Sequence, residues 1–271
     1  MMKKSLIFSG LMLYLVYVIL PVVLIILGSF GEKWFGTLFP QGFTLQWYKD
    51  LFSRSMYIRA LRMSIIVGGL SVIINSFVGI CTAYAVSVFG KRWLKSLVNF
   101  LVLLPVAIPP VVMGLGLIQA FNWPSFSWVG TTKLLLGAHL VYTLPFMLKP
   151  IVANFELIDW KTMEEAGLSL GASWPLLVRK VLIPNVIPGI ISGALMTFSM
   201  SLGEFQLAVM VTGSATQTYP VVLYQAFYVS TGFACAATVL LVAISIFSLV
   251  GLLILGKLFG FSTSEMTIGG V

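Results

Sequence analysis

The chain has 271 residues, of which 59% are hydrophobic and only 9% are charged, and its mean hydropathy is +1.05. About a quarter of the residues of a soluble domain are charged, so this composition excludes a soluble globular protein. The formal net charge of +8 is spread over loops, with no basic tract interleaved with aromatic residues. We therefore expect a lipid membrane as the solvent and no nucleic-acid partner.

Six apolar segments are long enough to be membrane helices, each of which needs about 20 residues to cross about 30 Å. They cover residues 6–29, 63–86, 97–121, 133–154, 186–211 and 235–257. The first continues past Pro21 and has no A-x-A site after it, which predicts a retained helix rather than a signal peptide. The sequence predicts an all-α integral membrane protein with six transmembrane helices, in which residues 1–271 form a single transmembrane domain.

Basic residues favour one orientation of these spans. Lysines and arginines precede the first span, lie between spans two and three and between four and five, and end the sixth. These residues are Lys3, Lys4, Lys91, Arg92, Lys95, Lys161, Arg179, Lys180 and Lys257. Bases mark the cytoplasmic side, so we expect both termini there. The opposite loop, residues 30–62, also carries bases, and the bias is therefore not clean.

Two segments on the predicted outer side are rich in aromatic residues. Residues 43–52 predict a short amphipathic helix at the membrane interface, with Thr44 as N-cap and Trp47, Tyr48 and Phe52 as anchors. The segment NWPSFSW (122–128) has turn-forming residues. Both segments have two interpretations, interfacial anchoring and a docking face for an outer partner.

Prolines interrupt the third span. Pro105, Pro109 and Pro110 break its backbone, and Gly114 and Gly116 follow. Broken helices at membrane depth are tolerated where they line protein or a cavity. Two interpretations carry equal weight: a kink that shapes packing, and a break in which Pro109 and Pro110 shape a pore.

The loop between spans four and five, residues 155–185, is charged and strongly patterned. Asp159 or Thr162 can cap a first short helix that carries Glu164, Glu165 and Ala166. Gly171 allows a sharp turn, and Ser173 can cap a second short helix. We expect Pro184 and Pro188 to end this second helix, and the two helices to meet at a steep angle. The alternative is an ordinary capped loop with solvated charges.

This loop carries a recognisable motif. It has Glu165-Ala166-Gly167, three further residues, Gly171, nine further residues, and then Val181-Leu182-Ile183-Pro184. The spacing resembles the E-A-A…G…I-x-L-P motif of the permease subunits of binding-protein-dependent ATP-binding-cassette (ABC) importers. Six spans and chain length agree with that family. The resemblance implies a type I importer permease fold in a bacterial inner membrane. It also implies that Glu164, Glu165, Ala166, Gly167, Leu170 and Gly171 contact a cytoplasmic ATPase.

The same resemblance implies the partners of the chain. They are an ATPase dimer, a second permease that is identical or homologous, and an external solute-binding protein. The chain has no GxxxxGK[ST] phosphate loop, so we expect it to bind no ATP, to need no cofactor and to be no enzyme. A loop rooted in spans four and five would convert closure of the ATPase into rocking of those spans.

Two segments narrow the predicted substrate. LLPVAIPPVVMGLGLI (103–118) and SMSLGEFQLAVM (199–210) resemble permeases for polyamines, 2-aminoethylphosphonate and ferric iron. Gly203-Glu204 stands where the polyamine permeases tend to carry an acidic pair, which favours aminoethylphosphonate slightly. The LGEF element also resembles sulfate and molybdate permeases, so sulfate, molybdate and ferric iron stay as alternatives.

Glu204 is the only acid inside a predicted span, and a charge at that depth should face protein, water or a partner. It is the first of four candidates for the translocation path, with Asn75, Pro109 and Gln119. The alternative for Glu204, which we favour slightly, is a hydrogen bond or an ion pair, for example with Arg62, that fixes helix packing. Interhelical hydrogen bonds would explain Asn75 and Gln119 equally well.

Other polar residues predict no further chemistry. Cys81 and Cys235 lie in apolar runs and are expected as small buried hydrophobic residues. His139 is expected as a packing residue, and no metal-binding spacing occurs. Two other classes of function remain: an ion-gradient-driven secondary transporter with Glu204 as its ion site, and a membrane enzyme. The first does not explain the loop motif, and the second lacks a catalytic cluster.

Overall fold

The computed structural model describes residues 2–37 and 39–258, and helices dominate this part of the chain. Five helical segments there are long and apolar enough to cross a membrane, and a bent pair of helices can form a sixth span. This confirms the expected all-α membrane fold. The five are α1 (Met2–Phe30), α3 (Ser55–Phe89), α6 (Thr132–Glu156), the continuous segment Trp174–Leu202, and α12 (Thr231–Leu258).

The chain divides into two compact units. The first runs through Ala60 and includes Val221–Ile244, and the second comprises Leu61–Pro220 with Ser245 onward. In the first unit, α2 (Gln46–Ser53) confirms the predicted short helix. The Trp47 indole donates to the Gly31 carbonyl at 2.8 Å, and the Tyr48 hydroxyl donates to Ser29 Oγ at 2.8 Å. These two residues therefore fasten α2 to the end of α1.

The start of α2 differs slightly from the prediction. Leu45 occupies the N-cap position and makes no side-chain capping bond. The Thr44 hydroxyl still accepts a hydrogen bond from the Gln46 amide at 3.1 Å. Gln46 is the first residue of α2, whereas a capping side chain usually accepts from the second or third residue of its helix. Of the three predicted aromatic anchors, Phe52 is the exposed one.

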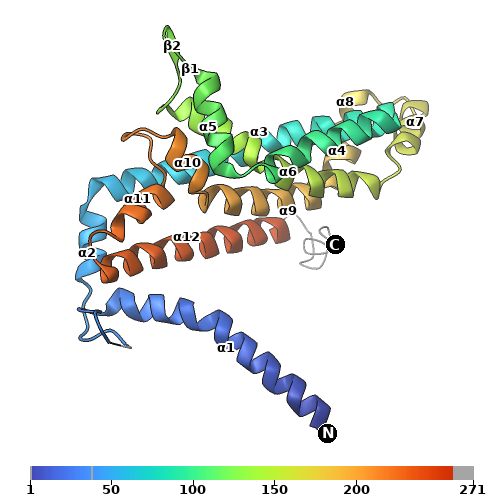
Figure 1. The fold of residues 1–271 in the computed structure, drawn as a ribbon. Coiled ribbons are helices and arrows are strands. Elements are labelled where there is room, and N and C mark those ends of the chain that lie inside the picture. Colours follow the sequence, from blue (N-terminus) through green and yellow to red (C-terminus); the bar gives the residue numbers. More distant parts are fainter. Residues whose placement is uncertain (1, 38, 259–271) are drawn as a thin grey trace. The chain divides into compact units, whose positions relative to one another are not determined.

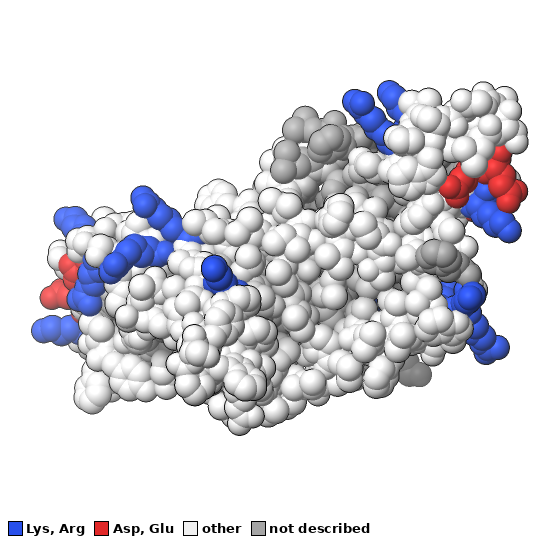
Figure 2. Space-filling view, turned by 90° about the horizontal axis from the view of Figure 1, so that it is seen from above, with Lys and Arg blue, Asp and Glu red and all other residues white. Residues whose placement is uncertain are grey.

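The surface of the isolated chain is strongly apolar along its spans. None of the most apolar window of α1 is buried, and the corresponding window of α12 is 6% buried. Figure 2 shows charged side chains gathered in groups, with wide areas of surface that carry none. Leucine, valine, isoleucine and phenylalanine side chains on this scale are stable only against lipid or another protein.

In the second unit, α6 and α9 (Ile183–Leu202) make an extensive helix contact and lie side by side in Figure 1. Small residues make this close approach possible. A Cβ atom added at Gly193 would lie 2.9 Å from the Met147 carbonyl oxygen, and one at Gly189 would lie 2.6 Å from the Pro150 carbonyl oxygen. Small residues at helix contacts are the usual way in which membrane helices gain packing energy.

The third predicted span is broken, as its prolines indicate. Helix α4 (Arg92–Ala107) and helix α5 (Pro110–Phe121) meet at 102°. Pro109 lies at the N-cap of α5, and Pro110 occupies its first turn, where a missing N–H costs nothing. A short hairpin of β1 (Asn122–Trp123) and β2 (Phe126–Ser127) follows, in the segment where the sequence predicts turns.

The fifth predicted span, 186–211, is wrong at both ends. Helix α9 stops at Leu202, and a separate short helix, α10 (Gln206–Val211), follows the break. At the other end, α8 (Trp174–Leu177) runs through a π-helical turn, η1 (Val178–Leu182), directly into α9. Hydropathy cannot detect either feature, because both depend on hydrogen bonding of the backbone.

Pro184 and Pro188 do not end the second short helix as predicted. Pro184 lies in the first turn of α9, and Pro188 lies inside it. Two side chains near the prolines bond to backbone carbonyls of the same helix. The Asn185 side-chain amide donates to the Val181 carbonyl at 2.7 Å, and the Ser192 hydroxyl donates to the Pro188 carbonyl at 2.9 Å. Prolines in membrane helices are tolerated where local π-helical adjustments and neighbouring groups satisfy the freed backbone, and η1 lies directly before Pro184.

The expectation for the cysteines is half right. Cys235 is buried, but Cys81 is exposed on α3. An apolar sequence context does not imply burial inside the protein when the surrounding solvent is lipid, so an exposed cysteine there is compatible with the membrane. Helix α11 (Tyr219–Ala226) joins the two units in sequence.

Candidate functional site

Asp159 caps the first helix of the predicted coupling loop, residues 155–185. Helix α7 (Trp160–Ser169) has Asp159 at its N-cap. One carboxylate oxygen accepts from the Thr162 amide at 3.3 Å, and the other accepts from the Thr162 hydroxyl at 2.6 Å. These hydrogen bonds to the charged form hold the pKa of Asp159 below its ordinary value. Of the two cap candidates, Asp159 therefore holds the cap position and Thr162 is its donor.

Gly171 forms the turn after α7. Its φ of +80° lies in the left-handed region that side chains with a Cβ avoid. The Gly171 amide donates to the Leu168 carbonyl at 2.9 Å, which closes the helix end. Ser173 then occupies the N-cap of α8, but its side chain makes no capping bond.

Gly167 stands where the E-A-A motif has its second alanine, and the structure gives a packing reason. A Cβ atom at this position would lie 2.3 Å from Leu177 Cδ2, so the neighbouring side chain would have to move. Leu177 belongs to α8 and is buried. The glycine therefore lets α7 and α8 pack closely, and Leu177 fills the space that the alanine would occupy.

The two acids of the loop differ in their surroundings. The Tyr84 hydroxyl, on α3, donates to a carboxylate oxygen of Glu164 at 3.5 Å. The same hydroxyl accepts from the Trp174 indole at 3.1 Å, and the Tyr84 ring makes edge contacts with Trp160 and Trp174. Glu165 is exposed, and its carboxylate has no hydrogen bond or ion pair with any described residue. Glu164 thus helps to hold the loop, while Glu165 is available to a partner.

An apolar core anchors the coupling loop to the spans. Trp160 is 2% exposed, and it packs with Phe155 at a ring-centroid distance of 6.4 Å. This core joins α3, α6, α7 and the start of α9, so the loop cannot move far without the helices that carry it. Its buried members are Ala83, Met147, Ile151, Phe155, Trp160, Leu177, Leu182, Val186 and Ala194.

The coupling loop also holds an open apolar groove of about 580 Å³. Ala166, Gly167 and Leu170 line it from α7 and its end, and Leu170 is 88% exposed. Leu176, Lys180 and Val181 line the opposite side. An exposed leucine beside small residues and a free acid is typical of a surface that packs against another protein.

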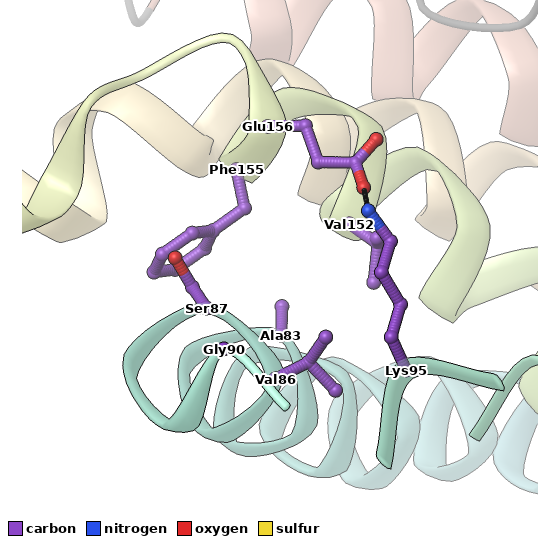
Figure 3. A pocket seen from close by; sticks show the side chains of 8 residues that line it. All are labelled: Ala83, Val86, Ser87, Gly90, Lys95, Val152, Phe155 and Glu156. Atoms are coloured by element: carbon purple, nitrogen blue, oxygen red, sulfur yellow. Dashed lines mark hydrogen bonds and ion pairs between the residues drawn. The ribbon is translucent and has the colours of Figure 1, made fainter. Parts of the chain in front are cut away.

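A second pocket, of about 240 Å³, lies where α3, α4 and α6 meet. Figure 3 shows Lys95 and Glu156 reaching towards each other across its edge, where they form an ion pair. Both side chains are about half exposed, at 53% and 52%, so the pair adds little stability. Phe155, which also lines the pocket, belongs to the core of the coupling loop, so the pair helps to position the end of α6.

Glu204 lies in the break between α9 and α10, and the prediction that it sits within a continuous span is wrong. Its two carboxylate oxygens accept from the Leu207 amide at 2.6 Å and from the Ala208 amide at 2.8 Å. The residue is 6% exposed. Its hydrogen-bond partners are thus backbone amides at the start of α10, which have no acceptor within the helix, and Arg62 is not among these partners.

A cavity of about 410 Å³ adjoins this break. It brings together three elements: Pro110 from the α4–α5 bend, Tyr142 from α6, and the segment from Ser199 to Gln206. Glu204 and Tyr142 supply polar groups, and the backbone of Gly203 is open to the cavity. Two helix breaks that meet at one cavity give it a wall of irregular backbone, which membranes tolerate only beside protein or water.

The other predicted path residues lie elsewhere. Asn75 is buried and donates to Thr143 Oγ1 at 3.0 Å and to the Leu140 carbonyl at 3.1 Å, so it joins α3 to α6. Pro109 is exposed beside Pro110, and Gln119 is exposed near the end of α5. Of the four candidates, Glu204 alone lines this cavity.

Tyr84 and Tyr142 are the residues that sequence reasoning missed. Both are aromatic residues within apolar spans, where nothing in the local pattern separates them from packing residues. A hydroxyl group inside a span is a weak signal that it bonds to something distant. In both cases the relevant neighbour lies more than 60 residues away in the chain.

Comparison with known proteins gives a consistent set of matches. Residues 75–258 match the family model described as "binding-protein-dependent transport system inner membrane component". A relative from Salmonella paratyphi A, named provisionally as the 2-aminoethylphosphonate transport system permease protein PhnV, is 30% identical over 212 residues, 78% of each chain. The spermidine/putrescine transport system permease protein PotC from Haemophilus influenzae is 28% identical over 208 residues, covering 77% of this chain and 79% of the relative.

Solved structures match the fold. A permease chain of a bacterial alginate ABC transporter, crystallised with a pentasaccharide-bound periplasmic protein, has a TM-score of 0.72 at 16% identity and covers 94% of both chains. A chain of the MetNI methionine ABC transporter in an inward-facing conformation has a TM-score of 0.62 at 18% identity, covering 75% of this chain and 96% of that one. At these identities the matches establish architecture alone.

Proposed function

This chain belongs to the family of binding-protein-dependent transport system inner membrane components, as the permease subunit of an ABC importer, and from that premise we propose that it carries a small solute with a primary ammonium group. The solutes favoured are 2-aminoethylphosphonate and a polyamine. The names of the relatives PhnV and PotC support this choice. The two kinds of solute differ in net charge, but both carry an aliphatic ammonium group that a carboxylate can bind.

The cavity beside Glu204 is the proposed passage for that group. Its wall holds a nearly buried carboxylate next to the Tyr142 side chain. A carboxylate has about four lone-pair sites, and backbone N–H groups at the start of α10, chiefly those of Leu207 and Ala208, occupy only part of them. The remaining sites can accept from a passing ammonium. In this proposal Glu204 has two tasks, since it holds the start of α10 and presents negative charge to the solute.

Glu204→Gln tests this proposal, because glutamine keeps the size of the side chain and removes its charge. If Glu204 contacts the ammonium group, uptake falls while the complex assembles and its ATPase still responds to loaded binding protein. If Glu204 is structural only, thermal stability or yield falls and uptake per assembled complex is unchanged. Melting temperature, stimulated ATPase activity and uptake are measured on one preparation. Wild-type values for all three would contradict both roles.

The helix breaks define the rest of the proposed path. Pro109 and Pro110 turn the chain at the α4–α5 bend, and Pro110 lines the Glu204 cavity. Gln119 lies further along α5 and is exposed, where a solute or a second permease can reach it. Asn75 has its amide engaged by α6, so we assign it to packing rather than to solute contact.

The coupling loop is the proposed contact with an ATPase partner, which hydrolyses the ATP that this chain cannot bind. The observation that carries this assignment is the groove of about 580 Å³ beside an unpaired acid, on a loop fixed to the spans by its own core. Ala166, Gly167 and Leu170 line it, the exposed Glu165 directly precedes Ala166 on α7, and Gly171 sets the turn. Glu164 acts indirectly, by holding α7 to Tyr84.

Glu165→Lys tests the contact by reversing the free charge. We expect normal membrane insertion, with uptake and stimulated ATPase activity at least about tenfold lower, the loss that about 1.4 kcal/mol of contact energy would give. The matched control is Glu32→Lys, the same reversal at another exposed acid, which lies on the predicted outer side. Normal uptake by the Glu165 variant at wild-type membrane levels would remove the coupling assignment.

The orientation and assembly follow from the same proposal. The ends of the chain and the coupling loop face the cytoplasm, and residues 1–271 act as one permease domain. Residue 1 and residues 259–271 lie outside the described residues. The partners are a second permease, an ATPase dimer and an external binding protein. Labelling of single cysteines introduced at Ser169 and at Ser214, in a variant without Cys81 and Cys235, tests the orientation: only the second should react from outside intact cells.

A further inference from the structure

A row of polar side chains runs through the packed helices of the second unit, and its function is not explained by the transport path. The residues repeat at helical spacing on the facing sides of α3, α6 and α9, and every one of them is buried. We call this row the polar seam. Its members are Ser71 and Asn75 on α3, His139 and Thr143 on α6, and Thr197 and Ser201 on α9.

Hydrogen bonds fix the register of the three helices along the seam. His139 Nδ1 and Ser201 Oγ are 2.7 Å apart and join α6 to α9. The Asn75 amide bonds to Thr143 Oγ1 and joins α3 to α6 one turn further along α6. A Cβ atom added at Gly68 would lie 3.6 Å from Ser201 Oγ, which places α3 against α9 at the level of His139.

Three atoms of the seam have no hydrogen-bond partner among the described residues, and each comes from a different helix. They are Ser71 Oγ on α3, His139 Nε2 on α6 and Thr197 Oγ1 on α9. Ser71 lies between Gly68 and Asn75, and Thr197 lies one turn from Ser201. The two fixed contacts therefore bracket all three atoms within neighbouring turns of the bundle.

Unpaired polar atoms in such a place are expensive. Burial of a hydroxyl or an imidazole nitrogen without a partner carries the full cost of its lost hydration, and native proteins avoid it. A buried water typically makes about three hydrogen bonds to polar groups that would otherwise be unsatisfied. Three unpaired atoms from three helices supply that number of partners.

We propose that the polar seam binds an internal water molecule, held by Ser71, His139 and Thr197, that bridges α3, α6 and α9. Hydroxyl groups donate and accept, so they can complete the water's bonds whichever hydrogen His139 carries. The site lies close to the end of α9, where the Glu204 amide donates to the Ser201 carbonyl at 3.4 Å. The water thus ties the three helices together just before the break that carries Glu204.

Thr197→Val separates a hydrated seam from a dry one by the sign of its effect. Valine has the shape of threonine without the hydroxyl. If the water is bound, it loses a partner, and the melting temperature of the chain in its complex falls by roughly 2–4 °C. If the seam is dry, the change removes an unpaired buried hydroxyl, and the melting temperature rises or stays constant.

Ser71→Ala provides a second, independent variant with the same expected sign. The double variant Ser71→Ala/Thr197→Val should cost less than the two single changes together, because both act on one water. Thr238→Val is the matched control, since that hydroxyl bonds only to the Ala234 carbonyl one turn earlier in its own helix. Additive effects, or a rise in both single variants, would overturn the proposal.

A high-resolution cryo-electron microscopy map of the assembled transporter gives the direct observation. We expect a density peak within hydrogen-bonding distance of Ser71 Oγ, His139 Nε2 and Thr197 Oγ1, and its loss in the double variant. The identity of the ligand is tested by exchanging Na⁺ for K⁺ or N-methylglucamine at constant ionic strength. A melting temperature that depends on the cation would contradict water as the occupant, and a map without the peak would contradict the site.

Discussion

Two carboxylates in this chain begin helices in nearly the same way, and they differ in what surrounds them. Asp159 binds the Thr162 amide at the start of α7, and Glu204 binds the Leu207 and Ala208 amides at the start of α10. Asp159 is on an exposed loop, whereas Glu204 is 6% exposed and faces a cavity among the spans. Water can replace the first carboxylate but not the second, so the same interaction is dispensable in one place and essential in the other.

Glu204→Ala should therefore have the largest effect. It leaves the Leu207 and Ala208 amides unpaired in a buried place, which costs about 2–4 kcal/mol. We expect poor assembly or a markedly lower melting temperature of the purified complex, with α10 detached from α9. Hydrogen–deuterium exchange over residues 203–212 measures this directly. Wild-type protection in the variant would mean that the burial of Glu204 does not decide its contribution.

Gly171→Val tests whether the exposed coupling loop depends on the backbone conformation of its turn. A β-branched residue at a φ of +80° costs at least about 1–2 kcal/mol, and the turn after α7 should rearrange. We expect normal insertion with a strong loss of uptake. The control is Gly171→Asn, because asparagine tolerates the left-handed region and should keep most of the activity. An equal loss of uptake in both variants would mean that any side chain at residue 171 is harmful, and that the left-handed backbone conformation is not the cause.

Tyr84→Phe should have a smaller effect, since it removes one hydroxyl that is only partly buried. Glu164 and the Trp174 indole each lose a hydrogen-bond partner, while the ring contacts with Trp160 and Trp174 remain. The expected cost is about 0.5–1.5 kcal/mol. Limited proteolysis of the loop should speed up, and uptake should fall by less than in the Gly171→Val variant. An unchanged rate would show that the ring alone holds the loop.

Asp159→Ala should have the smallest effect of the four, a modest rise in hydrogen exchange at the first turn of α7. The pKa of Asp159 is below its ordinary value, so its contribution is complete above about pH 4 and is lost as the pH falls through the lowered folded value. Between pH 5 and 8 protection should not change with the titration of this group. Asp159→Asn keeps a cap without titrating and should abolish the acid sensitivity. A large loss of hydrogen-exchange protection in Asp159→Ala at pH 7 would mean that Asp159 is as important to its helix as Glu204 is to α10.

The two regions also differ in how well the sequence predicts them. The cap of α7 and the Gly171 turn depend on residues within a few positions: the sequence predicts the turn and limits the cap to Asp159 or Thr162. The break after Leu202 is invisible to hydropathy, because residues 186–211 are predominantly apolar and Glu204 is the only charged residue among them. The unequal roles of Glu164 and Glu165 depend on Tyr84, which is distant in the chain. Short polar loops with distinctive cap and turn residues can thus be predicted, whereas breaks within apolar spans and contacts between distant spans cannot.

The π-turn between α8 and α9 has a consequence for the direction in which the coupling loop points. Leu177, Leu182 and Val186 all face the same core, yet the first interval is one residue longer than the α-helical spacing of the second. Each residue of an α-helix turns the chain by about 100°. Deleting one of the three residues Val178, Arg179 or Lys180 would leave every motif residue present, shorten the interval between Gly171 and Val181 by one residue, and restore a regular helix. It would also swing α8 about a quarter of the way around the axis of α9. The register of this single turn therefore determines the side of the span to which α8 and the proposed ATPase contact are turned.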